Sequence, residues 1–178
     1  ILDIAGSDFD RKDVFNLLYN PCVIHSFNTS RSEIDTWLEW AQKMRIFNNH
    51  IDNISTWQRG IQRLCLGRIM SQVKKAGSKT NLAFKEIIPF TDPYTSEPEL
   101  LQKFCDTIET LYNEINKIPA ECSGTEWYTI IQHVLTECIS IPGDKDGEHT
   151  VLNNILTALK KLKEFDSLTV DFIKEYIT

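Results

Sequence analysis

The sequence has no uninterrupted apolar segment of the roughly 20 residues that a membrane-spanning helix requires, so we expect no membrane partner. It contains none of the motifs that mark nucleotide-binding proteins and serine hydrolases: no P-loop, no G-x-G-x-x-G and no G-x-S-x-G. Its 5 cysteines have no C-x-x-C spacing, and its 4 histidines are scattered. We therefore predict no catalytic residues, no metal site and no cofactor. The cysteine pattern is typical of a protein from the reducing cytoplasm.

The composition is that of an ordinary globular protein, with 42% hydrophobic and 25% charged residues in a chain of 178. This length allows one domain with its own core. The chain begins at Ile1 without a methionine and ends at Thr178 within an apparently helical pattern. We expect a fragment of a longer chain, with residues 1–178 forming a single helical domain in which sub-lobes 1–80 and 94–178 can be distinguished.

Helix-start signals recur along the chain, each followed by apolar residues at helical spacing. Capping pairs are Ser30 with Glu33, Ser55 with Gln58, Ser96 with Glu99, and Ser123 with Glu126; Asp10 and Ser167 are single caps, and a further apolar stripe runs from Val151 to Leu162. The predicted fold is all-α, a bundle-like domain of about seven helices. One irregular connection near 82–93, interrupted by Pro89 and Pro93, is expected to pack on the core.

The helix predicted from Ser55 to about Lys75 contains two internal glycines, Gly60 and Gly67. Each glycine costs a helix up to about 1 kcal/mol relative to alanine. A helix that retains two of them is expected to have other segments packed very closely against it at those positions.

Charge is unevenly distributed along this acidic chain. Residues 1–90 carry a net charge of +3 and residues 91–178 a net charge of −9, and from Lys43 to Lys85 there are nine basic residues and one acidic residue, Asp52. Such a basic segment indicates an anionic partner. An equally weighted alternative is that it packs against the acidic second half. The candidate residues for contact with DNA or a partner are Arg59, Arg63, Arg68, Lys74, Lys75 and Lys79.

Four tryptophans divide into two predicted groups. Trp37, Trp57 and Trp127 fall on apolar helix stripes, which favours core packing. Trp40 is assigned to the opposite face from Trp37 and is predicted to be an exposed aromatic contact, where it would stack on a base beside the basic segment.

The segment from Ser55 to Met70 resembles a characteristic stretch of the exodeoxyribonuclease V gamma subunit family, RecC. In that family a Trp is followed by two residues, Gly-Leu, two variable residues, Leu-Leu-Gly and an aromatic. Here Trp57, Gly60 and Leu64 hold the corresponding places, and Gly67 stands for the second glycine one position later than this spacing gives. The order of neighbouring segments agrees over nearly the whole chain. Arg68 replaces the family's aromatic residue, and no base-reading residue carries over.

The resemblance implies a fragment from the helical insertion of a helicase-like region that has lost its ATPase site. It further implies a non-catalytic scaffold domain, not an enzyme by itself, in a complex that processes double-strand DNA ends for recombinational repair. The implied partners are a motor-nuclease subunit, a second motor subunit, and DNA, contacted directly or indirectly. Two alternatives stay open from the sequence: a helical protein-interaction module unrelated to DNA, and a small α-helical enzyme.

Overall fold

The computed structural model describes residues 1–48, 56–74, 87–90, 97–143 and 146–177. Within these residues the helices are α1 (Leu2–Gly6), α2 (Arg11–Leu18), α3 (Pro21–Ser26), α4 (Arg31–Lys43), α5 (Trp57–Lys74), α6 (Pro98–Ile115), α7 (Gly124–Cys138), α8 (Asp146–Lys161) and α9 (Val170–Ile177). Two short strands, β1 (Glu121–Cys122) and β2 (Leu168–Thr169), pair antiparallel. The predicted all-α fold is confirmed. In the described part of the chain, no helix combines the length and apolar character that crossing a bilayer requires.

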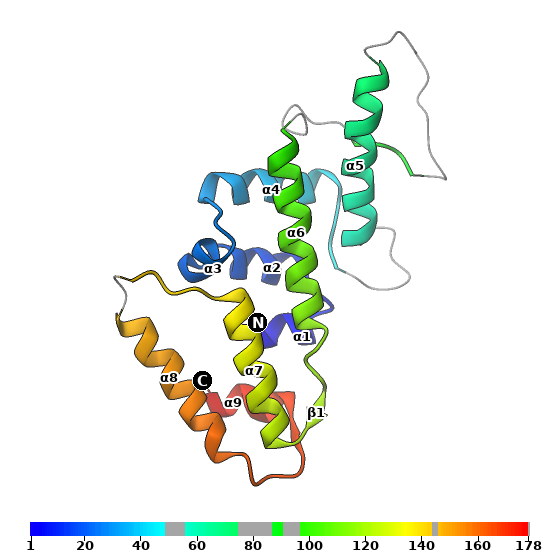
Figure 1. Ribbon diagram of the computed structural model, residues 1–178. Coiled ribbons are helices and arrows are strands. Elements are labelled where there is room, and N and C mark those ends of the chain that lie inside the picture. The colour runs from blue at the N-terminus through cyan, green and yellow to red at the C-terminus, as the bar shows by residue number, and fades with distance from the viewer. Residues whose placement is uncertain (49–55, 75–86, 91–96, 144–145, 178) are drawn as a thin grey trace.

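Helix α6 is the central element of the fold (Figure 1). Helices α2 to α4 lie on one side of it and α5 on the other, while α7, α8 and α9 form the end of the molecule that contains the C-terminus. The apolar stripe of α6 explains this position, since Leu101, Phe104, Ile108 and Leu111 are all buried.

Phe104 of α6 is surrounded by three tryptophans from two other helices. Its ring centroid lies 5.7 Å from those of Trp37 and Trp40 in α4, and 6.4 Å from that of Trp57 in α5. The predicted burial of Trp37 and Trp57 is confirmed. The predicted exposure of Trp40 is wrong, because its side chain is fully buried. Residues three apart lie on neighbouring parts of one helix surface, so both tryptophans of α4 face α6.

A second core cluster joins α7, α8 and α9. Trp127, buried as predicted, packs there with Leu159, Leu162 and Ile173. Its indole Nε1–H donates a hydrogen bond of 2.8 Å to the Leu168 carbonyl, which ties α7 to the two-stranded sheet. The first core cluster, which contains Phe104 and its three tryptophans, includes residues of the N-terminal helices, of α6 and of the end of α7. Apolar packing therefore crosses the predicted division between the two sub-lobes. The division itself stays a prediction.

The predicted caps were mostly correct. Asp10 caps α2, and complete capping boxes are present at Ser30 and Ser123. The cap predicted at Ser167 was wrong, because the Thr169 hydroxyl accepts the hydrogen bond from the first turn of α9. Ser96 lies outside the described residues, and the N-cap of α6 is Glu97. The predicted cap at Ser55 lies outside the described residues.

Two short helices were not predicted. One of them, α3, begins at Pro21, where the sequence predicts only the end of the preceding helix. Asn20 accepts a hydrogen bond from the Cys22 N–H, and Pro21 occupies the first turn, where its missing N–H costs nothing. The other, α1, contains only 5 residues.

Candidate DNA or partner interface

Helix α5 carries the arginines of the predicted interface, and its two glycines determine how it packs. A Cβ at Gly60 would overlap the Ile46 side chain, and a Cβ at Gly67 would overlap the backbone carbonyl of Phe90. The expectation of close approach at both glycines is therefore confirmed. Of the predicted irregular connection, the structure describes residues 87–90, where Phe90 packs against the first core cluster.

Arg63 joins three segments. Its Nε donates to the Ile88 carbonyl at 3.1 Å, and its Nη1 donates to the Met44 carbonyl at 3.2 Å. Its own carbonyl accepts a bond of 3.0 Å from the Phe90 N–H. Because Met44 is the C-cap of α4, the Arg63 guanidinium binds a carbonyl at the end of a helix, where positive charge is favourable. The guanidinium therefore has a structural role, whatever else it contacts.

The other predicted contact residues have different placements. Arg59 and Arg68 lie on α5 and are half-buried, with further interactions of their own. Lys74 is the last residue of α5, but its side chain lies outside the described part of the structure, as do Lys75 and Lys79 entirely. The structure thus brings Arg59, Arg63 and Arg68 onto one helix and leaves the three lysines as predictions.

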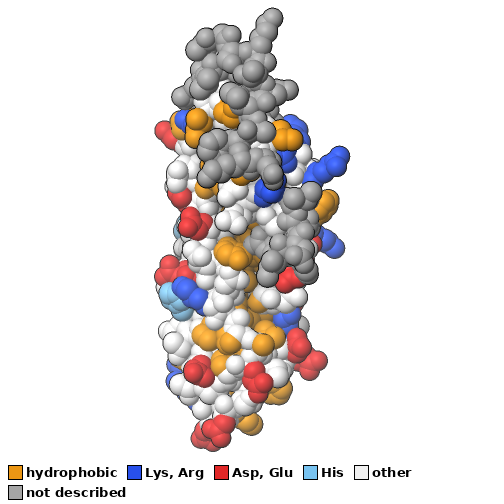
Figure 2. Space-filling model, turned by 90° about the vertical axis from the view of Figure 1, so that its right-hand side faces the viewer, with side chains coloured by type: hydrophobic (Ala, Val, Ile, Leu, Met, Phe, Trp, Pro, Cys, Tyr) orange, Lys and Arg blue, Asp and Glu red, His pale blue; other side chains and the backbone are white. Residues whose placement is uncertain are grey.

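The surface on the α5 side of the molecule is unevenly charged (Figure 2). Lys and Arg side chains gather in the upper part of this face, and Asp and Glu side chains are more frequent toward the end formed by α7 to α9. The alternative that the basic segment packs against the acidic second half would place bases of the first half beside acids of the second. Two ion pairs that connect the halves have the reverse arrangement. Glu33 pairs with Lys103 at 3.0 Å, and Asp3 pairs with Lys174 at 3.4 Å, so in both cases the first half supplies the acid.

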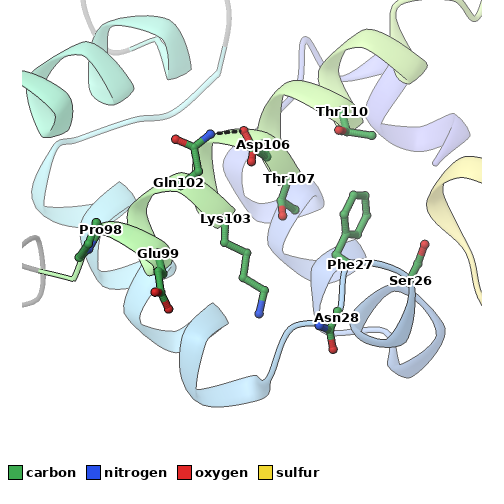
Figure 3. A pocket seen from close by; sticks show the side chains of 10 residues that line it. All are labelled: Ser26, Phe27, Asn28, Pro98, Glu99, Gln102, Lys103, Asp106, Thr107 and Thr110. Atoms are coloured by element: carbon green, nitrogen blue, oxygen red, sulfur yellow. Dashed lines mark hydrogen bonds between the residues drawn. The ribbon is translucent and has the colours of Figure 1, made fainter.

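An open cleft of about 700 Å³ lies between α6 and the turn after α3. Phe27 and Lys103 reach into it, and Gln102 donates to Asp106 along the α6 surface (Figure 3). The Lys103 ammonium is bound by both carboxylate oxygens of Glu33, at 3.0 and 3.2 Å. The pair formed by Lys103 and Glu33 therefore holds α6 and α4 together.

Glu33 is the most heavily bonded carboxylate of this region. Burial by itself raises its pKa, but hydrogen bonds from Lys103, Ser30 and Thr29 outweigh that effect and hold the pKa below its ordinary value of 4.5. The bonds come from the capping box of α4 and from α6, so ionised Glu33 connects the start of one helix to the side of another.

Another polar cluster, formed by Glu114, Lys117 and His133, connects α6 to α7. The sequence did not predict it. Glu114 is only 7% exposed. Its carboxylate lies 2.5 Å from the Lys117 ammonium and 3.1 Å from Nε2 of His133. The spacing of Glu114 and Lys117 could have suggested the first contact, but nothing local predicts the contact with α7. Within the described residues, no three His, Cys, Asp or Glu side chains are grouped in a way that could hold a metal ion.

These contacts define a helical domain whose described polar and charged clusters mainly join its helices. The whole chain, residues 1–178, matches the family model described as the RecBCD enzyme subunit RecC fourth domain, and the chain belongs to this family. No curated protein sequence matches the chain. The family match confirms the resemblance found around Trp57 and Gly67 and favours it over an interaction module unrelated to DNA.

Proposed function

We propose that this chain is a non-catalytic scaffold domain of a RecC-like subunit, within the helical insertion of its helicase-like region. In this role it supports the processing of double-strand DNA ends by an exodeoxyribonuclease V complex. The family match over residues 1–178 carries the proposal. The partners are the motor-nuclease subunit, the second motor subunit and DNA, and the surface of contact is the α5 face with Arg59 and Arg68.

The packing of the chain supports a scaffold role. Phe104 and its three tryptophans fix α4, α5 and α6 relative to one another, and aromatic clusters of this size dominate the energetics of a core. Arg63 and Gly67 fix α5 against residues 87–90, and Gly60 lies against the Ile46 side chain. A helix held in this way presents its outward charges at defined positions, as a surface that positions DNA or a protein partner requires.

The test uses the complete complex with substitutions in this domain. Arg59→Gln with Arg68→Gln removes two positive charges from α5, and Lys161→Gln removes one exposed charge from α8 as the control. Assembly is followed by size-exclusion chromatography, and ATP hydrolysis and unwinding are measured per assembled complex. We expect the α5 variant to lose assembly or affinity for duplex ends while ATP hydrolysis by assembled complexes is retained.

A catalytic role for the domain would give the reverse pattern. The α5 variant would then assemble and bind ends like the control but lose ATP hydrolysis or strand cleavage. Arg63 is left unchanged in this test because its bonds to the Ile88 and Met44 carbonyls would confound charge with folding.

A further inference from the structure

The outer surface of α9 carries two aromatic side chains that stack on each other in solvent. Phe172 and Tyr176 lie one helical turn apart, with ring centroids separated by 5.9 Å and ring planes inclined by 17°. Phe172 is 42% exposed and Tyr176 is 40% exposed. Ile173, the residue after Phe172, is fully buried in the second core cluster and anchors the inner side of the helix. Helix α9 therefore presents an ordered aromatic surface to its surroundings.

Two carboxylates accompany this aromatic pair. Asp171 and Glu175 each directly precede one of the two aromatic residues, and both are exposed. In the described part of the chain, neither carboxylate has an ion-pair or hydrogen-bond partner. Lys174 of the same helix is paired with Asp3 of α1 at 3.4 Å instead. The aromatic surface is thus bordered by two negative charges that the described residues do not neutralise.

We propose that Phe172 and Tyr176 form a docking site for an arginine-bearing segment of a protein partner. A guanidinium group is planar, stacks on aromatic rings and forms paired hydrogen bonds with carboxylates, so it matches both features of this surface. A purely apolar partner would bury the two carboxylates without an opposite charge, which is costly. DNA would be repelled by them. The combination of stacked rings and carboxylates therefore favours arginine over either alternative.

This inference rests on the proposed function, because it takes the partner to be one of the two motor subunits of the complex. It adds a second contact surface, opposite in charge to the α5 face. Helix α9 lies at the other end of the molecule from α5 (Figure 1), so a partner on α9 leaves the arginines of α5 accessible. In this arrangement α9 contacts protein, and the α5 face is left for DNA.

The first test measures the binding of the complete RecC-like subunit to each motor subunit by surface plasmon resonance. Phe172→Ala with Tyr176→Ala removes the aromatic stack. Asp171→Asn with Glu175→Gln removes the two charges but retains the shape of the side chains, so it keeps the test valid if the first variant folds poorly. We expect each double variant to raise the Kd for one motor subunit by about tenfold or more.

The matched control is Glu164→Gln with Asp166→Asn, which removes two exposed charges from the connection between α8 and β2. This variant should leave the Kd unchanged. A Kd that either α9 variant leaves unchanged, or that the control raises equally, overturns the inference but leaves the proposed function intact. If the unsubstituted subunit binds neither motor subunit, the proposed function fails and the inference fails with it.

Crosslinking then identifies what lies on α9. The photoreactive residue p-benzoylphenylalanine replaces Tyr176 in the complete subunit, the assembled complex is irradiated, and the adducts are mapped by mass spectrometry. We expect an adduct beside an arginine of a motor subunit. Adducts found only on DNA, on a second copy of this chain or on a segment without arginine contradict the inference, as does the absence of any adduct.

Discussion

Gly67 of α5 lies directly against the backbone carbonyl of Phe90, with no space for a Cβ between them. Phe90 also donates its N–H to the Arg63 carbonyl one turn earlier in the same helix. These two contacts attach residues 87–90 to α5, and the helix keeps a residue of poor helix propensity in order to allow them.

Gly67→Ala should therefore destabilise the chain by about 1–3 kcal/mol, although alanine is the better helix former, because a backbone carbonyl must move. Gly147 in α8 is the matched control, since a Cβ there meets nothing within 4 Å. Gly147→Ala should be neutral or stabilise by up to about 1 kcal/mol. Urea unfolding measures both. Equal effects of the two substitutions would show that the approach to Phe90 is unimportant.

Glu33 predicts a pH dependence of stability. Its pKa in the folded chain lies below the ordinary value of 4.5, so its contribution is fully present above pH 4.5 and disappears as the pH falls through the lower folded value. Glu33→Gln should lower the free energy of unfolding by about 1–2 kcal/mol at pH 7, and the difference from the wild type should shrink below pH 4.5.

The control for Glu33 is Glu39→Gln, which breaks an exposed i, i+4 pair with Lys43 on the same helix. Such pairs contribute about 0.3–0.5 kcal/mol. Denaturant titrations at several pH values compare the two variants. A Glu33→Gln effect as small as that of Glu39→Gln, or one independent of pH, would contradict the assigned hydrogen bonds.

The tryptophans differ in how their indole N–H groups are used. Nε1 of Trp57 donates a bond of 2.9 Å to the Phe9 carbonyl, whereas the buried Nε1 of Trp40 has no hydrogen-bond partner among the described residues. Both Trp57→Phe and Trp40→Phe create a cavity, but the first also strands a buried carbonyl. Trp57→Phe should therefore cost about 1–3 kcal/mol more, as measured by thermal or urea unfolding. Equal costs would show that the bond to Phe9 contributes little.

The thiol of Cys65 should titrate unusually early. Its pKa of about 6 predicts that the rate of its alkylation by iodoacetamide rises with a midpoint near pH 6. Cys105→Ala removes the hydrogen bond that contributes most to this shift, so the midpoint should move up toward about 8.5, the value of an unperturbed thiol. Peptide mapping after short alkylation pulses gives both midpoints. An unchanged midpoint in the variant would exclude the contact with Cys105 as the cause.

The fold could be predicted from the sequence wherever the signal is local. The capping boxes at Ser30 and Ser123 involve side chains three residues apart, and the apolar stripe of α6 repeats at helical spacing. The helix α3 was missed because Asn20-Pro21 can both end one helix and begin the next. The prediction that Trp40 is exposed was wrong because it placed Trp40 on the opposite face of its helix from Trp37. A spacing of three residues places the two side chains next to each other on one helix surface.

The candidate site was less predictable, since its contacts join residues distant in the sequence. The sequence correctly indicated that Gly60 and Gly67 mark close approaches, but it did not show that Phe90 and Ile46 are the residues that approach. Similarly, the charge pattern selected Arg63 as an interface residue, while its carbonyl partners lie 19 and 25 positions away. Charge alone does not distinguish a guanidinium that binds an anionic partner from one that binds two carbonyls.

The most direct test of the account is the salt dependence of duplex binding by the chain. The logarithm of the binding constant for a fluorescent blunt-ended duplex should fall linearly with the logarithm of salt concentration. Arg59→Gln with Arg68→Gln should weaken binding and reduce the slope by up to about 2, while Lys161→Gln on α8 leaves both unchanged. Identical affinity and slope for the α5 variant and the control would contradict the claim that α5 presents its charge to DNA.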